Sequence, residues 1–143
     1  IANKFKNKYF KDENLKFVHD KNNLNEFDIF YTSNSLQYLN DIYKFLDFLT
    51  KKKPKLIFLC GLLAGNIPNF KTNQKYYNNY IEVNFTNFGQ LNNYIEKRNY
   101  KLVKKEYSNQ KYFGKYNNLP MNNFYYKYRI EKKLNLMYIN KTL

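Results

Sequence analysis

The segment FDIFYTSNSLQYLND (residues 27–41) determines the fold that the sequence predicts. Its first five residues, 27–31, form an apolar run that is typical of a buried strand. Small polar residues follow, and the segment ends on Asn40 and Asp41, either of which suits the N-cap of a helix. A strand, a polar loop and a helix in this order indicate an α/β unit, with Thr32 to Gln37 at the carboxyl end of the strand.

The residues after this segment continue the same pattern. Apolar residues with helical spacing predict a helix that Pro54 ends; they are Ile42, Phe45, Leu46 and Leu49. Residues 55–65, KLIFLCGLLAG, are apolar on both faces, which is typical of a central parallel strand. Residues 69–83 have no clear periodicity, and we expect a long surface loop there.

The remaining elements alternate in the same way. We expect a short strand at 14–20, a helix capped by Thr86 or Asn87, a strand at 99–107 and a terminal strand at 134–139. Right-handed crossovers between such elements would make most of the sheet parallel. In open sheets of this kind ligands bind at the carboxyl ends of the strands, where Thr32 to Gln37 are predicted to lie.

The composition fits one domain of 143 residues with an ordinary hydrophobic content of 43%. The net charge of +14 suggests nucleic-acid binding. However, Asn, Lys and Tyr are abundant together while Ala, Gly and Arg are scarce, which is the pattern that an AT-rich genome imposes on any protein. We therefore favour compositional drift and consider a nucleic-acid partner unlikely.

The expected cellular location rests on two features of the sequence, the lack of a recognisable sorting signal and the single cysteine. No apolar run approaches the ~20 residues that cross a bilayer, and no signal peptide is visible. Cys60 is the only cysteine, so it cannot form an internal disulfide, and a buried thiol in a reducing, cytoplasmic setting is expected.

Several catalytic classes lack their motifs. There is no glycine-flanked serine, no P-loop and no G-x-G-x-x-G, and the His, Cys, Asp and Glu residues have no metal-ligand spacing. His19 is the only histidine and ends the predicted strand at 14–20. It is a candidate general base, although a single histidine is more often incidental.

A succession of short motifs supplies a family resemblance. The motifs are SLQYL (35–39), PK (54–55), TNQ (72–74), NYKLVKKEY (99–107), LPMNNF (119–124) and LNLMY (134–138). In this order they resemble a family of S-adenosylmethionine-dependent methyltransferases found in bacterial surface-polysaccharide gene clusters. The similarity covers nearly the whole chain, and Asn99 stands where the family usually has glycine.

The resemblance implies a Rossmann-like class I methyltransferase fold, with a mostly parallel sheet and an antiparallel final strand. It implies S-adenosylmethionine as cofactor, with Asp20 near the adenine and Thr32, Ser33, Asn34 and Ser35 at the methionine end. Gln37 and Gln74 would bind the acceptor, a glycan or glycan precursor, and His19 and Tyr38 are the candidates for the base. No metal is implied.

The first strands of that fold, with the glycine-rich cofactor loop, have no counterpart in the chain. We therefore expect residues 1–143 to be a single domain, the C-terminal two-thirds of an N-terminally truncated methyltransferase. It would bind the cofactor weakly or not at all and could form a homodimer through an exposed sheet edge. Two alternatives stay open, which are a non-catalytic interaction domain and a basic nucleic-acid-binding module.

Overall fold

The computed structural model describes residues 18, 20–108, 130 and 132–142. They form seven strands, two α-helices and two short 3-10 helices, which follow one another as η1 (Lys21–Asn23), β1 (Ile29–Ser33), η2 (Leu36–Tyr38), α2 (Ile42–Lys51), β2 (Leu56–Leu62), β3 (Ala64–Gly65), β4 (Phe70–Tyr76), β5 (Asn79–Asn87), α3 (Phe88–Glu96), β6 (Tyr100–Tyr107) and β7 (Leu134–Asn140). No helix in this part of the chain is both long and apolar enough to cross a membrane.

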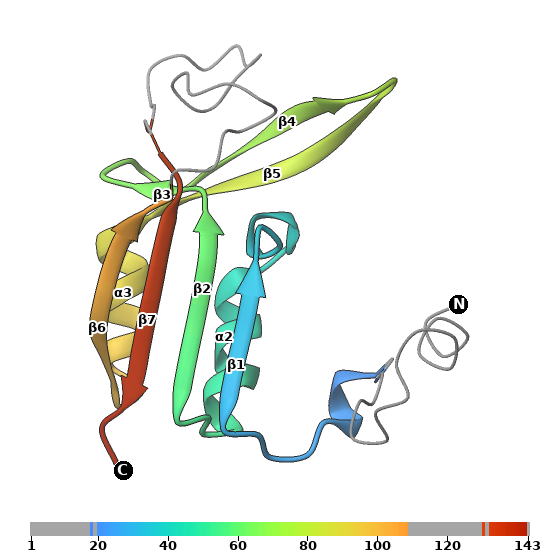
Figure 1. The fold of residues 1–143 in the computed structure, drawn as a ribbon. Coiled ribbons are helices and arrows are strands. Elements are labelled where there is room, and N and C mark those ends of the chain that lie inside the picture. The colour runs from blue at the N-terminus through green and yellow to red at the C-terminus, as the bar shows by residue number, and fades with distance from the viewer. Residues whose placement is uncertain (1–17, 19, 109–129, 131, 143) are drawn as a thin grey trace.

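The main sheet has four strands in the order β1-β2-β7-β6 (Figure 1). β1 and β2 are parallel, whereas β7 is antiparallel to both of its neighbours. A second sheet, β3-β5-β4, consists of the antiparallel β4–β5 hairpin and a short parallel pairing of β3 with β5.

The prediction of a Rossmann-like, mostly parallel sheet is therefore wrong. Among the described connections, only the helical crossover β1–α2–β2 joins neighbouring strands of the main sheet, and it produces the one parallel ladder between described strands there. The last strand, β7, lies between β2 and β6 and is antiparallel to both. The resulting sheet is mixed, with antiparallel pairing predominant.

The surface loop expected at residues 69–83 is also absent, since most of that range forms β4 and β5. A two-residue turn, Tyr77–Asn78, joins the strands, and Tyr77 has a positive φ of 53°. Such hairpin turns usually contain glycine or an Asn-Gly pair, so the local sequence did not indicate this one.

The predicted helix at Ile42 to Leu49 is present as α2, and Asp41 is its N-cap. An Asp41 carboxylate oxygen accepts from the backbone N–H of Lys44 at 2.9 Å. Asn87 caps α3 in the same way, accepting from the N–H of Gln90 at 2.8 Å. Of the strand expected at 14–20, only Val18 and Asp20 are described, and neither lies in a strand.

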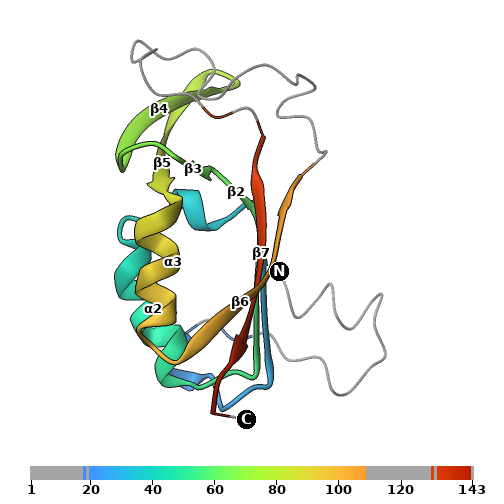
Figure 2. The same cartoon turned by 90° about the vertical axis from the view of Figure 1, so that its left-hand side faces the viewer.

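Helices α2 and α3 pack on one face of the main sheet (Figure 2). The core between them contains fully buried side chains from the helices and from β2 and β7, including Leu46, Leu91, Ile57, Leu59 and Tyr138. A smaller cluster, with Leu63, Ile67, Val83, Phe85 and Ile130, anchors the hairpin.

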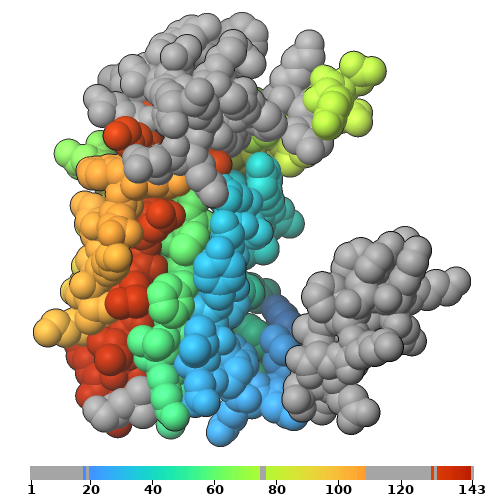
Figure 3. Space-filling model, viewed as in Figure 1, coloured from blue at the N-terminus to red at the C-terminus, as the bar shows by residue number. Residues whose placement is uncertain are grey.

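In the described part of the chain, no helix covers the other face of the main sheet (Figure 3). Side chains alternate along each strand, so the residues between the core positions point to this side. Register places them in two apolar rows, Ile29–Leu56–Ile139 and Tyr31–Phe58–Met137. Tyr31 is 65% exposed, and Ile29 and Ile139 are exposed as well.

Candidate functional site

The carboxyl ends of β1 and β2 each carry a residue in the left-handed conformation. Asn34, immediately after β1, has a φ of 53°, and Gly61 near the end of β2 has a φ of 67°. The Asn34 N–H donates to the carbonyl of Cys60 at 2.9 Å, so the two bends lie side by side. Non-glycine residues rarely adopt this conformation, and they cluster at functional sites when they do.

Gly61 is required here for space as well as for conformation. A Cβ at this position would collide with the side-chain amide of Asn34. The Gly61 N–H also donates to Oδ1 of Asn135 at 2.9 Å, which ties β2 to β7. The close approach of Asn34 to the Gly61 backbone is therefore possible because Gly61 has no side chain.

Lys133 supplies a buried cation beside these bends. Its Nζ donates to Oδ1 of Asn34 at 2.7 Å, and the residue is only 7% exposed. Burial lowers the pKa of its ammonium group. The Asn34 side chain continues the network, because its Nδ2 donates to Oγ of Ser33 at 2.9 Å. Asn34 therefore links a charged group to a hydroxyl at the sheet edge.

Gln37 lies behind the same loop, in η2. Its Nε2 donates to the carbonyl of Asn34 at 2.8 Å, and the residue is 3% exposed. Its Oε1 is buried and has no hydrogen-bond partner among the described residues. Buried polar atoms are nearly always paired in native proteins, so an unsatisfied one marks a place where a ligand or water can bind. We call Ser33, Asn34, Gln37, Lys133 and Asn135 the carboxyl-edge cluster.

The β4–β5 hairpin is attached directly to this region. Nδ2 of Asn84, in β5, donates to the carbonyls of Gln37 at 3.0 Å and Leu39 at 2.7 Å. Gln74 of β4 is buried, but it pairs with Ile81 and so lies on the opposite face of the hairpin from Asn84. The hairpin therefore does not bring Gln74 to Gln37, although both were predicted to bind the acceptor.

The other predicted site residues are distributed as follows. Thr32 ends the core-facing side of β1, and Ser35 is exposed with its Oγ donating to the carbonyl of Ser33 at 2.9 Å. Tyr38 is 42% exposed in η2, at the same end of the sheet. His19 lies outside the described residues.

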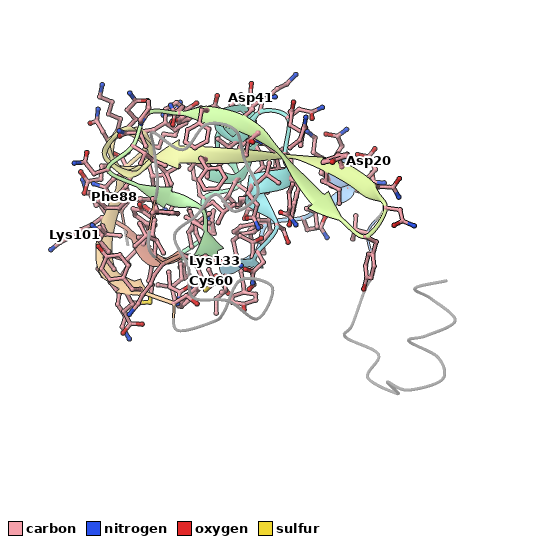
Figure 4. All side chains as sticks on the ribbon, turned by 90° about the horizontal axis from the view of Figure 1, so that it is seen from above. Asp20, Asp41, Cys60, Phe88, Lys101 and Lys133 are labelled. Carbon is pink, nitrogen blue, oxygen red and sulfur yellow. The ribbon has the colours of Figure 1, made fainter. Side chains whose placement is uncertain are left out.

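Asp20 is not brought together with the cluster. Its carboxylate caps η1 by accepting from the N–H of Asn22 at 2.9 Å. The segment after η1 is fixed to the far end of α2, where Lys52 Nζ donates to the carbonyl of Leu24 at 2.7 Å. Figure 4 shows Asp20 well apart from Lys133 and Cys60. Its predicted partners Thr32 to Ser35 therefore lie at the other end of β1.

Lys133, Asn84 and Asn135 were not predicted as site residues. Asn135 offered one local signal, because asparagine is disfavoured inside a strand and here it stands among Leu134, Leu136 and Met137. Lys133 and Asn84 offered none in a chain where lysine and asparagine are common. Among the described residues, no three His, Cys, Asp or Glu side chains lie close enough to hold a metal ion.

Comparisons of the chain with protein-family models, with curated proteins and with solved structures found no match.

Proposed function

We propose that the chain is part of an S-adenosylmethionine-dependent methyltransferase that acts on a glycan or glycan precursor. The motif succession from SLQYL (35–39) to LNLMY (134–138) supports this proposal from the sequence. The position of SLQYL supports it from the structure, because this motif lies directly beyond the carboxyl end of β1. Ligands of α/β proteins bind at such strand ends.

One observation carries the proposal: Asn34 and Gly61 form adjacent left-handed bends, with Lys133 hydrogen-bonded to Asn34. A left-handed asparagine costs about 1 kcal/mol, and a buried ammonium has a desolvation penalty in addition. Three other non-glycine residues of the described chain are also left-handed, so the contact with the buried Lys133 is what distinguishes Asn34. The arrangement is typical of a site where polar groups are held ready for a ligand.

The donor set matches one half of the cofactor better than the other. A buried ammonium from Lys133 and the hydroxyls of Ser33 and Ser35 suit the carboxylate of the methionine portion. For the adenosine portion, the predicted partner Asp20 lies at the opposite end of β1. The four glycines, at 61, 65, 89 and 114, form no glycine-rich loop. We therefore propose weak cofactor binding by residues 1–143.

S-adenosylmethionine supplies an electrophilic methyl group, and in-line displacement by an acceptor oxygen or nitrogen needs mainly correct positioning. Gln37 and the hairpin would position the acceptor, and an acceptor hydroxyl must lose its proton. Tyr38, in η2 beside Gln37, is the proposed base. The acceptor would be a cytoplasmic glycan precursor, a setting in which the lone Cys60 stays reduced.

Titration of the 15N-labelled chain with S-adenosylhomocysteine tests the proposal by NMR. We expect millimolar affinity, with shifts of the Thr32–Ser35 amides, and a smaller response to adenosine. Lys133→Met should weaken the binding, whereas Lys101→Met on the exposed β6 should not. Ser35→Ala, at an exposed position, tests the same contact if Lys133→Met does not fold.

Two results would contradict the proposal in different ways. If S-adenosylhomocysteine saturates the chain without shifting the amide signals of Thr32–Ser35, the carboxyl edge is not the cofactor site. Micromolar binding would show that this chain holds the whole cofactor, contrary to the proposed division between the methionine and adenosine portions.

A second candidate, an interaction domain that forms a homodimer, is favoured by the sheet face that no described helix covers and by the edge of β1. β1 pairs only with β2 among the described strands, and Ile29 and Tyr31 are exposed beside this edge. Unpaired strand edges readily pair with another chain. Light scattering should then show a dimer that Tyr31→Lys dissociates and Tyr80→Lys, at a 70% exposed hairpin position, does not. A monomer at high concentration would exclude this candidate.

A further inference from the structure

A cavity of about 280 Å³ lies between the N-terminus of α2 and the β4–β5 hairpin. It is close to the lower end of the range for small-molecule sites, ~300 Å³, so a ligand of one or two rings would fill it. Its polar lining comes from both walls and includes Asp41, Tyr43, Asn69, Lys71, Asn84 and Thr86. None of these residues was predicted from the sequence to bind a ligand.

The hairpin wall of the cavity is held in place by hydrogen bonds that leave further donors and acceptors available. Asn69 Nδ2 donates to Oε1 of Gln90, and its Oδ1 accepts from the N–H of Asn87, both at 2.6 Å. Lys71 Nζ donates to Oε1 of Glu82 at 2.7 Å. An ammonium group has three N–H donors, so one such bond does not exhaust Lys71.

The helix wall is fixed in the same manner. Asp41 accepts from the N–H of Lys44 and thereby caps α2, and a carboxylate can accept about four hydrogen bonds. Tyr43 also lines the cavity, but its hydroxyl is buried and so offers a ligand no accessible group. The cavity is thus a preformed space whose polar groups retain hydrogen-bonding capacity.

The charges select against an anionic ligand. The Asp41 carboxylate already occupies the N-terminus of α2, which is the place where a phosphate would otherwise bind. Among the described lining residues, Lys71 is the one lysine and is paired with Glu82, and there is no arginine. A ligand here must accept from an ammonium and amides and also donate to a carboxylate, which a neutral polyol does through its hydroxyl groups.

The cavity adjoins the carboxyl edge through a shared residue. Asn84 lines the cavity, and its Nδ2 also holds the carbonyls of Gln37 and Leu39. In the view from above, Asp41 lies on the helix side of the hairpin and Lys133 on the other side (Figure 4). A ligand in the cavity would thus be next to η2, the element that contains Gln37 and Tyr38.

We propose that this cavity binds a neutral saccharide unit. Its assignment as the sugar of the methyl acceptor rests on the proposed function, whereas saccharide binding itself does not. The chain offers a matched control, a second hollow of about 280 Å³ that includes Asp28 and Lys55. The Lys55–Asp28 ion pair there resembles the Lys71–Glu82 pair, with lysine side chains 56% and 49% exposed.

NMR titration of the 15N-labelled chain with glucose, galactose and N-acetylglucosamine, one at a time, tests the proposal. At least one sugar should shift the amides of Asp41 to Tyr43 and of Asn84 to Thr86 in a saturable manner. Lys71→Gln should raise the Kd about tenfold, the effect of one lost charge-assisted hydrogen bond. Asp41→Asn removes the second charged group and keeps an N-cap residue, and it should also raise the Kd. Lys55→Gln should leave the Kd unchanged.

The outcomes separate this proposal from the proposed function. Sugar-induced shifts at Ser33 to Gln37, without shifts at the cavity, would overturn the cavity as the saccharide site and leave the glycan acceptor in place. A response to S-adenosylhomocysteine at Thr32–Ser35 without a response to any of the sugars would likewise overturn only the saccharide proposal. Tighter binding of glucose 1-phosphate than of glucose would overturn the argument from charge.

Discussion

The Nζ of Lys133 lies 2.7 Å from Oδ1 of Asn34, although 99 positions separate the two residues in the sequence. The contact exists because β7 runs next to β2, and β2 runs next to β1. It brings the residue before the last strand to the end of the first. The strand order therefore brings the residues of the carboxyl-edge cluster together, and Asn34 makes the contact that joins its two ends.

Replacement of Asn34 should destabilise the fold, to an extent that depends on the substitute. Asn34→Ala keeps a Cβ in a left-handed conformation and leaves the Lys133 ammonium with one acceptor fewer, so we expect a loss of about 2–3 kcal/mol. Asn34→Gly relieves the backbone and should cost about 1 kcal/mol less than alanine. Urea denaturation followed by circular dichroism measures both. Equal losses would show that the φ of Asn34 stores no strain.

Gly61→Ala should be more damaging than either change at Asn34. The new Cβ meets the Asn34 amide, which the Lys133 hydrogen bond holds in place, and the φ of 67° adds about 1 kcal/mol of strain. We expect a total loss of about 3 kcal/mol or more, within the range of overpacked sites.

The double variant Asn34→Gly/Gly61→Ala separates these two costs. Without the Asn34 side chain, the collision disappears while the strain at residue 61 remains. The loss in the double variant should be smaller than the sum of the single losses, with a coupling of at least ~1 kcal/mol in a double-mutant cycle. Additive losses would mean that Asn34 moves aside freely.

Local patterns were sufficient to predict the helices and most strands. Asp41 and Asn87 were among the predicted caps, because a capping side chain and the N–H that it binds lie within three residues. The pairing of the last strand was not predictable in this way, although the family resemblance implied an antiparallel final strand. Its place between β2 and β6 depends on contacts between distant residues, so the assumption of a mostly parallel sheet failed.

The same distinction between local patterns and distant contacts applies to the candidate site. Ser33 to Gln37 could be found from the sequence, because polar residues after an apolar run mark a strand end. Asn84 could not, since its hydrogen bond to Gln37 spans 47 residues and depends on a hairpin whose turn, Tyr77–Asn78, contains no glycine. The lining of the cavity could not be predicted from the sequence either, because the hairpin forms one of its walls.

Acid should weaken a contact that joins α2 to α3. Arg98 donates through Nε to Oδ1 of Asp47 at 2.8 Å, and its guanidinium lies 3.5 Å from the ring centre of Tyr94. Hydrogen bonds from Tyr94 and Arg98 lower the pKa of Asp47. The folded state therefore favours the ionised carboxylate. Its contribution to stability is complete above the unfolded pKa of about 3.9 and is lost as the pH falls through the lower folded pKa.

Asp47→Asn tests this dependence. Its urea midpoint should lie below that of the parent chain at pH 7, and the two midpoints should converge as the pH falls below about 3.9. Asp28→Asn, which removes the exposed ion pair with Lys55, should leave the midpoint nearly unchanged at pH 7. A constant difference between Asp47→Asn and the parent chain at all pH values would rule out an electrostatic origin.

Cys60 should react slowly with alkylating reagents at neutral pH. It is half-buried at the carboxyl end of β2, and burial raises the pKa of its thiol above the ordinary value of 9.0. The thiolate is the reactive species, so the rate of iodoacetamide labelling should be below that of free cysteine at pH 8 and should keep rising beyond pH 9. Mass spectrometry of samples quenched over time gives the rate, and the chain in urea gives the rate for an exposed thiol. If iodoacetamide labels Cys60 at pH 8 as fast in the folded chain as in urea, the fold does not protect the thiol.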